Sequence, residues 1–320
     1  MKKLFILFSL FAIGISPELY AQYTETINAN RPGNSQGGFA VGRGVIQAEV
    51  GSYYGIDKHD LTDVKTKNFG SEYEIRYGLL TENLELNIRG DFNFIKQEIP
   101  VGGTTETISS SNFRSNTIGA KYLVYDPYKM REFEKPNLYS WKANHSFKWR
   151  DLIPAVSVYA GYNFTPGSRP EGYPFFGGEI ANSSLKLALI TQHNWGDTAL
   201  IMNFIADRLT DDHKRYSAIF TFTQAVGMRS TIFAEFQTII DDFYSDELLR
   251  LGGAYLVMPD LQVDLSGMVN FKNTPFRWQI GVGASYRFDF HSIDEKIKDP
   301  NDKKGGQEYN LTPADDGGGE

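Results

Sequence analysis

The sequence predicts an all-β protein whose strands close into a transmembrane, outer-membrane antiparallel β-barrel of about twelve strands. Three observations predict this class: a start with the features of a secretory signal, a period-two alternation that recurs along the chain, and connections that alternate between long and short. Aromatic residues make up 14% of the chain, which is typical of a barrel with aromatic girdles at both membrane interfaces. The chain has no cysteine, which excludes a disulfide framework.

The first residues carry the export signal. Lys2 and Lys3 precede an apolar run from Leu4 to Ile15, and Ala21 stands before Gln22 as a cleavage point, so residues 1–21 are expected to be a signal peptide. A plain N-terminal membrane anchor is the weaker alternative, because a spanning helix needs roughly 20 apolar residues. Removing Lys2, Lys3 and Glu18, whose charges sum to +1, changes the net charge from −7 to −8. This acidity argues against nucleic acid as a partner.

The alternation is clearest from Asn83 to Phe94 and from Arg277 to Phe288. In the first segment Leu84, Leu86 and Ile88 fall on one face, while Glu85, Asn87 and Arg89 fall on the other. Successive strand residues point to opposite sides, so each segment forms a strand with one apolar and one charged surface. Similar patterns place the twelve strands near 45–56, 69–79, 83–95, 112–124, 153–164, 184–195, 198–207, 215–226, 231–240, 247–257, 261–271 and 277–288.

The connections test this number independently, because one end of an outer-membrane barrel has long loops and the other has short turns. The expected extracellular loops are polar or charged and span residues 57–68, 96–111, 165–183, 208–214, 241–246 and 272–276. The expected periplasmic turns, at 80–82, 196–197, 227–230 and 258–260, are tight. Residues 125–152 break the pattern: either the strands extend there, or a small helix packs under the barrel.

The alternation also divides the chain into domains. We expect an N-terminal periplasmic lead-in at 22–44, a transmembrane barrel at 45–288 and a disordered periplasmic tail at 289–320. The tail is rich in Gly, Asp and Lys and nearly devoid of apolar residues, so it cannot bury enough surface to offset its ordering entropy.

Alternation alone does not say which face meets water, because a soluble barrel turns its apolar face inward and a membrane barrel turns it toward lipid. The asymmetric connections, the aromatic residues at strand ends and the export signal favour the membrane; a secreted soluble barrel or sandwich is the alternative. In a membrane barrel the charged face lines the lumen. Seven acidic and six basic candidates there predict weak ionic selectivity: Glu49, Glu72, Glu74, Arg76, Glu85, Arg89, Asp91, Lys121, Lys186, Glu235, Arg250, Asp264 and Arg287.

Several short motifs resemble one family. An Arg-Pro pair is followed by a Gly just before a strand with Gln-x-Glu and Gly; the residues are Arg31, Pro32, Gly44, Gln47, Glu49 and Gly51 within NANRPGNSQGGFAVGRGVIQAEVGSYYG (28–55). These residues resemble the opening of a bacterial outer-membrane transporter family labelled "putative MetA-pathway of phenol degradation". RYGLLTENLEL (76–86), GAKY (119–122), IPAVSVYAGYNFTPG (153–167) and GVGASYRF (281–288) also fit. The resemblance spans 28–288 and implies a barrel for passive uptake or export of small compounds, aromatic ones among them. The chain departs from the family's pattern in the 125–152 connection and the tail.

Residues for catalysis or metal binding do not form a recognisable pattern. The five histidines are scattered, so no metal-ligand spacing appears and no cofactor is expected. His145 and Ser146 are adjacent, but neighbouring strand residues point to opposite faces and could not act together, so the chain is not expected to be an enzyme.

We therefore expect a channel or transporter for passive movement of small solutes, aromatic or hydrophobic ones included, in the outer membrane of a Gram-negative bacterium. The expected partners are outer-membrane lipid and lipopolysaccharide, the solute, and the barrel-assembly machinery during biogenesis. One alternative is a non-conducting structural or binding barrel that acts through its loops or tail. A lipid-modifying enzyme is the third hypothesis.

Overall fold

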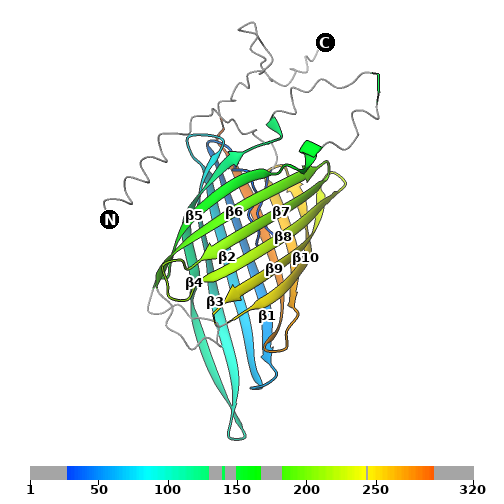
Figure 1. Cartoon of the computed structure of the whole chain (residues 1–320). Coiled ribbons are helices and arrows are strands. Elements are labelled where there is room, and N and C mark those ends of the chain that lie inside the picture. The colour runs from blue at the N-terminus through cyan, green and yellow to red at the C-terminus, as the bar shows by residue number, and fades with distance from the viewer. Residues whose placement is uncertain (1–26, 130–138, 141–148, 167–181, 243, 292–320) are drawn as a thin grey trace, which may run out of the picture.

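The computed structural model describes residues 27–129, 139–140, 149–166, 182–242 and 244–291, and within them it confirms a closed antiparallel barrel of twelve strands (Figure 1). The expected signal peptide and the tail from residue 292 onward lie outside the described residues, as do His145 and Ser146. The strands are β1 Val45–His59, β2 Val64–Gly78, β3 Leu84–Val101, β4 Thr104–Tyr125, β5 Ala155–Phe164, β6 Ser183–Trp195, β7 Thr198–Asp207, β8 Arg215–Val226, β9 Ser230–Asp241, β10 Asp246–Met258, β11 Leu261–Asn270 and β12 Phe276–Asp289.

Each strand pairs with its neighbours in sequence, and β1 closes the ring by pairing with β12 from Val45 opposite Asp289 to Lys58 opposite Phe276. Because the ring has no open edge, the backbone N–H and C=O groups of the strands are paired without help from solvent, as a hydrocarbon environment requires.

Apolar side chains point out of the barrel and charged side chains point in. Glu85 on β3 is 1% exposed, whereas the next residue, Leu86, is 38% exposed; on β12, Arg287 is 4% and Ile280 is 54% exposed. A soluble barrel would show the reverse, because folding in water removes apolar surface from solvent. Other exposed outward residues include Val50, Phe69, Ile118, Val158, Leu187, Phe222, Ile232, Leu251, Leu265 and Val282. The barrel therefore spans a membrane with this apolar surface toward lipid.

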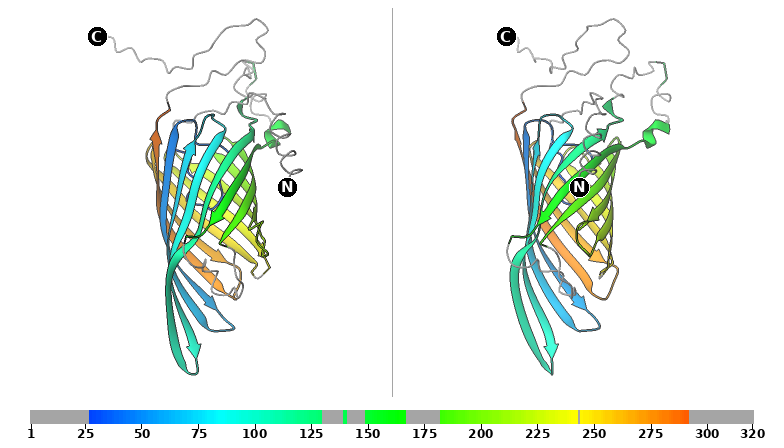
Figure 2. Two further views of the ribbon diagram at one scale, coloured as in Figure 1. Left: turned by 90° about the vertical axis from the view of Figure 1, so that its left-hand side faces the viewer. Right: turned by 60° about the vertical axis from the view of Figure 1, so that its left-hand side comes forward.

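Two of the expected loops are in fact continued strands. Residues 57–68 and 96–111 belong to the β1–β2 and β3–β4 hairpins, which project beyond the rest of the barrel wall (Figures 1 and 2). Gly102 and Gly103 both have positive φ, 58° and 87°, as a tight two-residue hairpin turn requires. The polar composition of these segments suggested loops, but the Thr, Ser and Ile residues of 96–111 favour strands. In the β1–β2 hairpin, Asp57, Thr66 and Asn68 are buried, as the inward face of a strand is.

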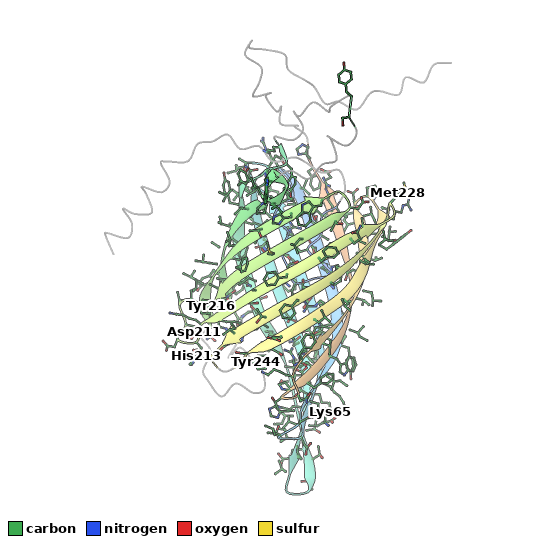
Figure 3. All side chains as sticks on the ribbon, turned by 45° about the vertical axis from the view of Figure 1, so that its right-hand side comes forward. Lys65, Asp211, His213, Tyr216, Met228 and Tyr244 are labelled. Atoms are coloured by element: carbon green, nitrogen blue, oxygen red, sulfur yellow. The ribbon has the colours of Figure 1, made fainter. Side chains whose placement is uncertain are left out.

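The opposite end of the barrel has the short turns, at 79–83, 196–197, 227–229 and 259–260. Gly196 and Gly227 occupy positive φ there, at 59° and 71°. Figure 3 shows Met228 in one of these turns, with Asp211 and His213 at the other end of the barrel. The 125–152 connection also lies at the short-turn end, and its described part includes a short 3₁₀ helix, η2 (Trp149–Leu152).

Three tyrosines lie over glycines on neighbouring strands. A Cβ atom at Gly70, Gly90 or Gly119 would collide with the ring of Tyr53, Tyr73 or Tyr159, respectively. The Tyr73 hydroxyl donates to Asn116 Oδ1 at 2.5 Å and the Tyr159 hydroxyl donates to Asn87 Oδ1 at 3.1 Å. Pairs of this kind fix the strand register because each ring fits only where its partner has no side chain.

No helix among the described residues is both long and apolar enough to cross a membrane.

Candidate functional site

The structure places all thirteen predicted lumen residues on the inward face of their strands. Glu72, Arg89, Asp91 and Lys186 are half-buried. The other nine are buried: Glu49, Glu74, Arg76, Glu85, Lys121, Glu235, Arg250, Asp264 and Arg287. Charged groups this far from water need partners, and most of them have one.

Four of these residues form one network across β1 to β4. The Arg76 guanidinium lies 2.9 Å from Glu85 and 3.3 Å from Glu49, and Lys121 Nζ lies 3.2 Å from Glu85 Oε1. Arg76 also donates from Nη1 to the backbone oxygen of Asn28 at 2.8 Å. The network therefore bonds to a segment that precedes the first strand as well as to the barrel wall.

That segment, residues 27–44, runs inside the barrel. The sequence predicted a periplasmic lead-in for 22–44, and for the described residues this is wrong. The backbone N–H of Ile27 donates to Pro259 O in the β10–β11 turn, and that of Gly44 donates to Gly78 O at the end of β2. Between these two points the chain enters the lumen and returns. The segment lies inside because buried carboxylates and amides on the barrel wall accept hydrogen bonds from the backbone N–H groups of the segment.

Arg31 lies in a slot on one side of the lumen, along a cross-strand row of four residues on the neighbouring strands β11, β12, β1 and β2. Its guanidinium donates to both oxygens of Asp264 at 3.2 Å and to Glu72 at 3.1 Å. Gly51 and Gly283, cross-strand partners on β1 and β12, leave the room that the guanidinium occupies, since a Cβ at either position would collide with it. This two-oxygen contact fixes the orientation of Arg31 as well as its position.

Glu235 anchors the turn of the segment. Its carboxylate accepts the backbone N–H of Asn34 at 2.9 Å and that of Ser35 at 3.2 Å. It also accepts the Thr221 hydroxyl at 2.9 Å and pairs with the Arg250 guanidinium. One buried wall carboxylate thus holds the segment from β9.

The returning half bonds to the remaining strands. Asn203 exchanges two hydrogen bonds with the backbone of Gln36, at 2.6 and 3.0 Å, and Gln192 Oε1 accepts Gly38 N–H at 2.8 Å. Lys121 Nζ donates to the backbone oxygens of Gly37 and Phe39 at 3.0 and 2.9 Å. The ring of Phe39 packs against Tyr128 of the 125–152 connection, with 6.0 Å between ring centroids. We call residues 28–44 the plug, because they bridge the lumen between its walls.

A cavity of about 290 Å³ lies between the plug and the end of the barrel opposite the short turns. Asn34 of the plug contributes to its wall, together with side chains from most of the strands. We call this cavity the outer chamber. Of the thirteen predicted residues, Glu72, Arg89, Asp91, Lys186 and Arg250 line it, whereas Arg287 lies at the opposite rim, 3.0 Å from Asp289. The wall also includes Arg114, Arg208, Arg215 and Arg277, which the sequence analysis did not select.

Sequence reasoning missed the plug because a polar, glycine-rich stretch without alternation looks like a solvated lead-in. A signal was nevertheless present: Gly51 and Gly283 fall on the charged face of β1 and β12, where side chains would otherwise fill the lumen. Among the residues that the structure describes, no group of three or more His, Cys, Asp or Glu side chains could hold a metal ion.

Solved structures similar to this chain include two channels and a translocator domain. The COG4313 outer membrane channel from Pseudomonas putida F1 is 12% identical, with 81% of this chain and 100% of that chain covered and a TM-score of 0.51. The TodX monoaromatic hydrocarbon channel deltaS2 mutant is 11% identical, with 78% and 91% covered and a TM-score of 0.46. The translocator domain of the autotransporter NalP from Neisseria meningitidis is 11% identical, with 77% and 89% covered and a TM-score of 0.45.

The likeness to the COG4313 channel, at a TM-score of 0.51 and 12% identity, shows a shared barrel fold. No curated protein matches the chain in sequence. The family model described as "Putative MetA-pathway of phenol degradation" matches residues 29–288, which is nearly the whole described barrel together with its plug. The chain belongs to this family.

Proposed function

We propose that this protein is a passive channel for small solutes in the outer membrane of a Gram-negative bacterium. The observation that carries the proposal is a closed barrel with an apolar exterior, a charged lumen and a chamber of about 290 Å³ inside. Barrels of eight strands are filled by their own side chains and those of 16 to 18 hold open water, so a barrel of twelve leaves room for a gated or narrowed path. The solved structure that shares this fold at a TM-score of 0.51 is an outer membrane channel, which supports the proposal.

In this function the plug is the element that limits passage. It lies across the lumen between the outer chamber and the short-turn end, and its bonds reach β1, β2, β6, β7, β9 and β11. A solute that crosses the barrel has to pass through the space that the plug occupies, so conduction requires the plug to shift.

A disulfide between plug and wall tests this requirement. A Cβ at Gly38 would lie 3.0 Å from Gln192 Cβ, close to the roughly 3.5–4.5 Å of a natural disulfide. The chain has no cysteine of its own, so Gly38→Cys/Gln192→Cys would form one defined bond. We expect the oxidised variant to lose solute flux into liposomes and to regain it on reduction. Flux that is identical in both states would contradict a mobile plug, and wild-type barrels that never pass any solute would contradict the channel itself.

The second candidate function is a non-conducting structural or binding barrel. The density of hydrogen bonds between plug and wall favours it, because a segment held this firmly could close the lumen permanently. The two candidate functions predict different results when a wall residue that holds the plug is replaced. A channel should then conduct more, whereas a permanently closed barrel should lose stability without gaining conductance.

The remaining parts of the proposal concern export and surroundings. Residues 1–21 act as the signal peptide, residues beyond β12 form a periplasmic tail, and the short-turn end faces the periplasm. The partners are outer-membrane lipid, lipopolysaccharide, the barrel-assembly machinery and the solute itself. The protein is not an enzyme; purified barrel that hydrolyses phospholipid would refute this.

A further inference from the structure

The projecting hairpins carry lysines on the face that continues the lipid-facing wall. On β3 the outward residues from Leu84 to Phe94 extend roughly 33 Å along the strand, at about 3.3 Å per residue. A strand tilt of about 40° makes this about 25 Å across the membrane, which is the height of the apolar band of an outer-membrane barrel. The next outward residue is Lys96, so the lysines begin where the hydrocarbon ends.

Aromatic side chains mark this border on the neighbouring strands. Tyr54, Phe69 and Phe94 are cross-strand neighbours on β1, β2 and β3, and all three are exposed. The ring centroids of Phe69 and Phe94 lie 6.2 Å apart, and Tyr54 contacts Trp278 of β12 with 6.0 Å between centroids. Aromatic residues in this position form the girdle at a membrane interface. The lysines that follow therefore lie at the level of the lipid headgroups.

Past the girdle, the outward strand positions of β1 to β4 hold four lysines and one carboxylate: Lys58, Lys65, Lys67, Lys96 and Glu98. Figure 3 shows Lys65 on the projecting part of the wall. Lys58 lies directly opposite Lys65, and Lys67 lies directly opposite Lys96. Like charges in directly opposite positions destabilise a sheet. An anion held between these lysines would offset the repulsion.

The neighbouring carboxylates do not neutralise this face. Glu98 lies 2.7 Å from Lys67. Asp60 and Asp63 lie in the turn at the tip of the β1–β2 hairpin; Asp60 is 3.8 Å from Lys58, and both side chains of that pair are exposed. Exposed pairs of this kind are weak. The other two lysines have no carboxylate within ion-pair distance among the described residues, so they are available to an external anion.

An open groove of about 440 Å³ joins the girdle to the lysines. Its lining combines aromatic rings, ammonium groups and serines of β4, and it includes Tyr54, Phe69, Phe94, Lys67, Lys96, Ser109 and Ser111. A phosphorylated sugar that carries acyl chains has matching parts, because its phosphate suits the ammonium groups, its hydroxyls suit the serines and its chains suit the apolar wall. The groove adjoins lipid, so a lipid headgroup fits this surface better than a free phosphate.

We propose that this face of β1 to β4 binds one lipopolysaccharide molecule of the outer leaflet through the phosphate groups of its lipid A. A phosphate lies among Lys65, Lys67 and Lys96, and the acyl chains run along the apolar wall from the girdle toward the short-turn end. This inference rests on the orientation in the proposed function, with the short-turn end toward the periplasm. It deepens that function by assigning a site to a lipid that was named there as a partner.

The test is native mass spectrometry of the full-length barrel in detergent, which counts bound lipids. Three probes separate the chemistry: lipid A with its phosphates, the same lipid A after removal of the phosphates, and phosphatidylglycerol. We expect one phosphorylated lipid A per barrel and weaker binding of the other two lipids. Lipid A binding should weaken as salt concentration rises, and added inorganic phosphate should not displace the lipid.

The matched variants are Lys65→Gln/Lys96→Gln and, as control, Lys214→Gln/Arg229→Gln. The first variant leaves Glu98 its partner Lys67, and the control removes the same charge from exposed residues elsewhere. A lysine near a lipid surface contributes about a fivefold gain in affinity, so the first variant should bind lipid A about 30-fold more weakly. The control should match the wild type.

Stability without lipid distinguishes a binding role from a structural one. The variant Lys65→Gln/Lys96→Gln relieves two like-charge pairs, so the lipid-free barrel should unfold at the same urea concentration as the wild type or a higher one. A lipid-free variant that is less stable than the wild type would show that the lysines support the fold and would overturn the site.

Binding in detergent depends on neither conduction nor orientation, so the proposals fail separately. Equal binding of lipid A with and without phosphates, or an unchanged lysine variant, would overturn the site even if liposomes show solute flux. Phosphatidylglycerol that binds as tightly as lipid A, or displacement by inorganic phosphate, would overturn lipopolysaccharide as the occupant. A membrane-impermeant thiol reagent should label Thr105→Cys, on the projecting β3–β4 hairpin, in intact cells. Failure to label it would refute the orientation.

Discussion

Replacing Glu235 by Gln should open the lumen. The carboxylate accepts backbone N–H groups of Asn34 and Ser35 at 2.9 and 3.2 Å, and it is 1% exposed. Hydrogen bonds to a charged group contribute about 1.5–3 kcal/mol each and those to a neutral group about 0.5–1.5 kcal/mol, so replacing the carboxylate by an amide oxygen weakens the two bonds of this anchor by about 2–3 kcal/mol in total. That is a shift of roughly 30- to 150-fold toward the displaced plug.

Single-channel conductance in planar bilayers measures this shift directly. We expect Glu235→Gln to show larger or more frequent open events than the wild type. Glu98→Gln is the control, because Glu98 pairs with Lys67 on the projecting hairpin and does not touch the plug. Heat-modified migration in detergent gels shows that each variant is folded.

The substitution also removes the ionic partner of Arg250. A second variant, Glu235→Gln/Arg250→Met, separates the two effects, since it leaves no unpaired buried charge while the plug anchor stays weak. Both variants should conduct more than the wild type. If both are folded and both keep the wild-type conductance, Glu235 does not hold a movable plug and the reasoning fails.

Three further outcomes are expected. Arg76→Gln should destabilise the barrel by about 3–5 kcal/mol, since it leaves Glu49 and Glu85 buried without their shared partner; urea unfolding in lipid vesicles checks this, and a loss below about 1 kcal/mol would contradict it. Gly283→Ala should displace Arg31 and raise conductance. Gly267→Ala should leave conductance unchanged, because a Cβ there would meet only the Gln279 carbonyl oxygen, at 4.0 Å; equal conductance in all three proteins would count against the Arg31 slot. Ile280→Arg should cost about 2–4 kcal/mol in membrane folding, and a fluorophore at Ile280→Cys that reports water would refute the lipid-facing assignment.

The strands were predictable because their information is local. Alternation with period two placed each strand to within a few residues, even at 198–207, where both faces are nearly equally apolar, except where β1 to β4 extend into the projecting hairpins. In the projecting hairpins the outward face of the strands does not meet the hydrocarbon of the membrane. Their outward residues are therefore less apolar, although the strands continue.

Only part of the candidate site could be predicted from the sequence. The inward position of residues such as Glu85 and Arg76 follows from parity along a strand. Their pairing does not, because it depends on which strands are neighbours and in what register, as between Arg76 and Glu49. Arg208 and Arg277 went unnoticed because they lie at a loop and a strand end, where the alternation is weakest.

By itself, then, the sequence determined a membrane-spanning barrel, its strand number and the inward set of charges, since each depends on the side to which successive residues of a strand point. Only the tertiary structure decided where residues 27–44 lie and how charge is distributed in the lumen. Both depend on long-range contacts, such as Arg31 with Asp264 and Asn34 with Glu235, that closing the ring brings together. A local sequence pattern does not predict a contact between residues about two hundred positions apart.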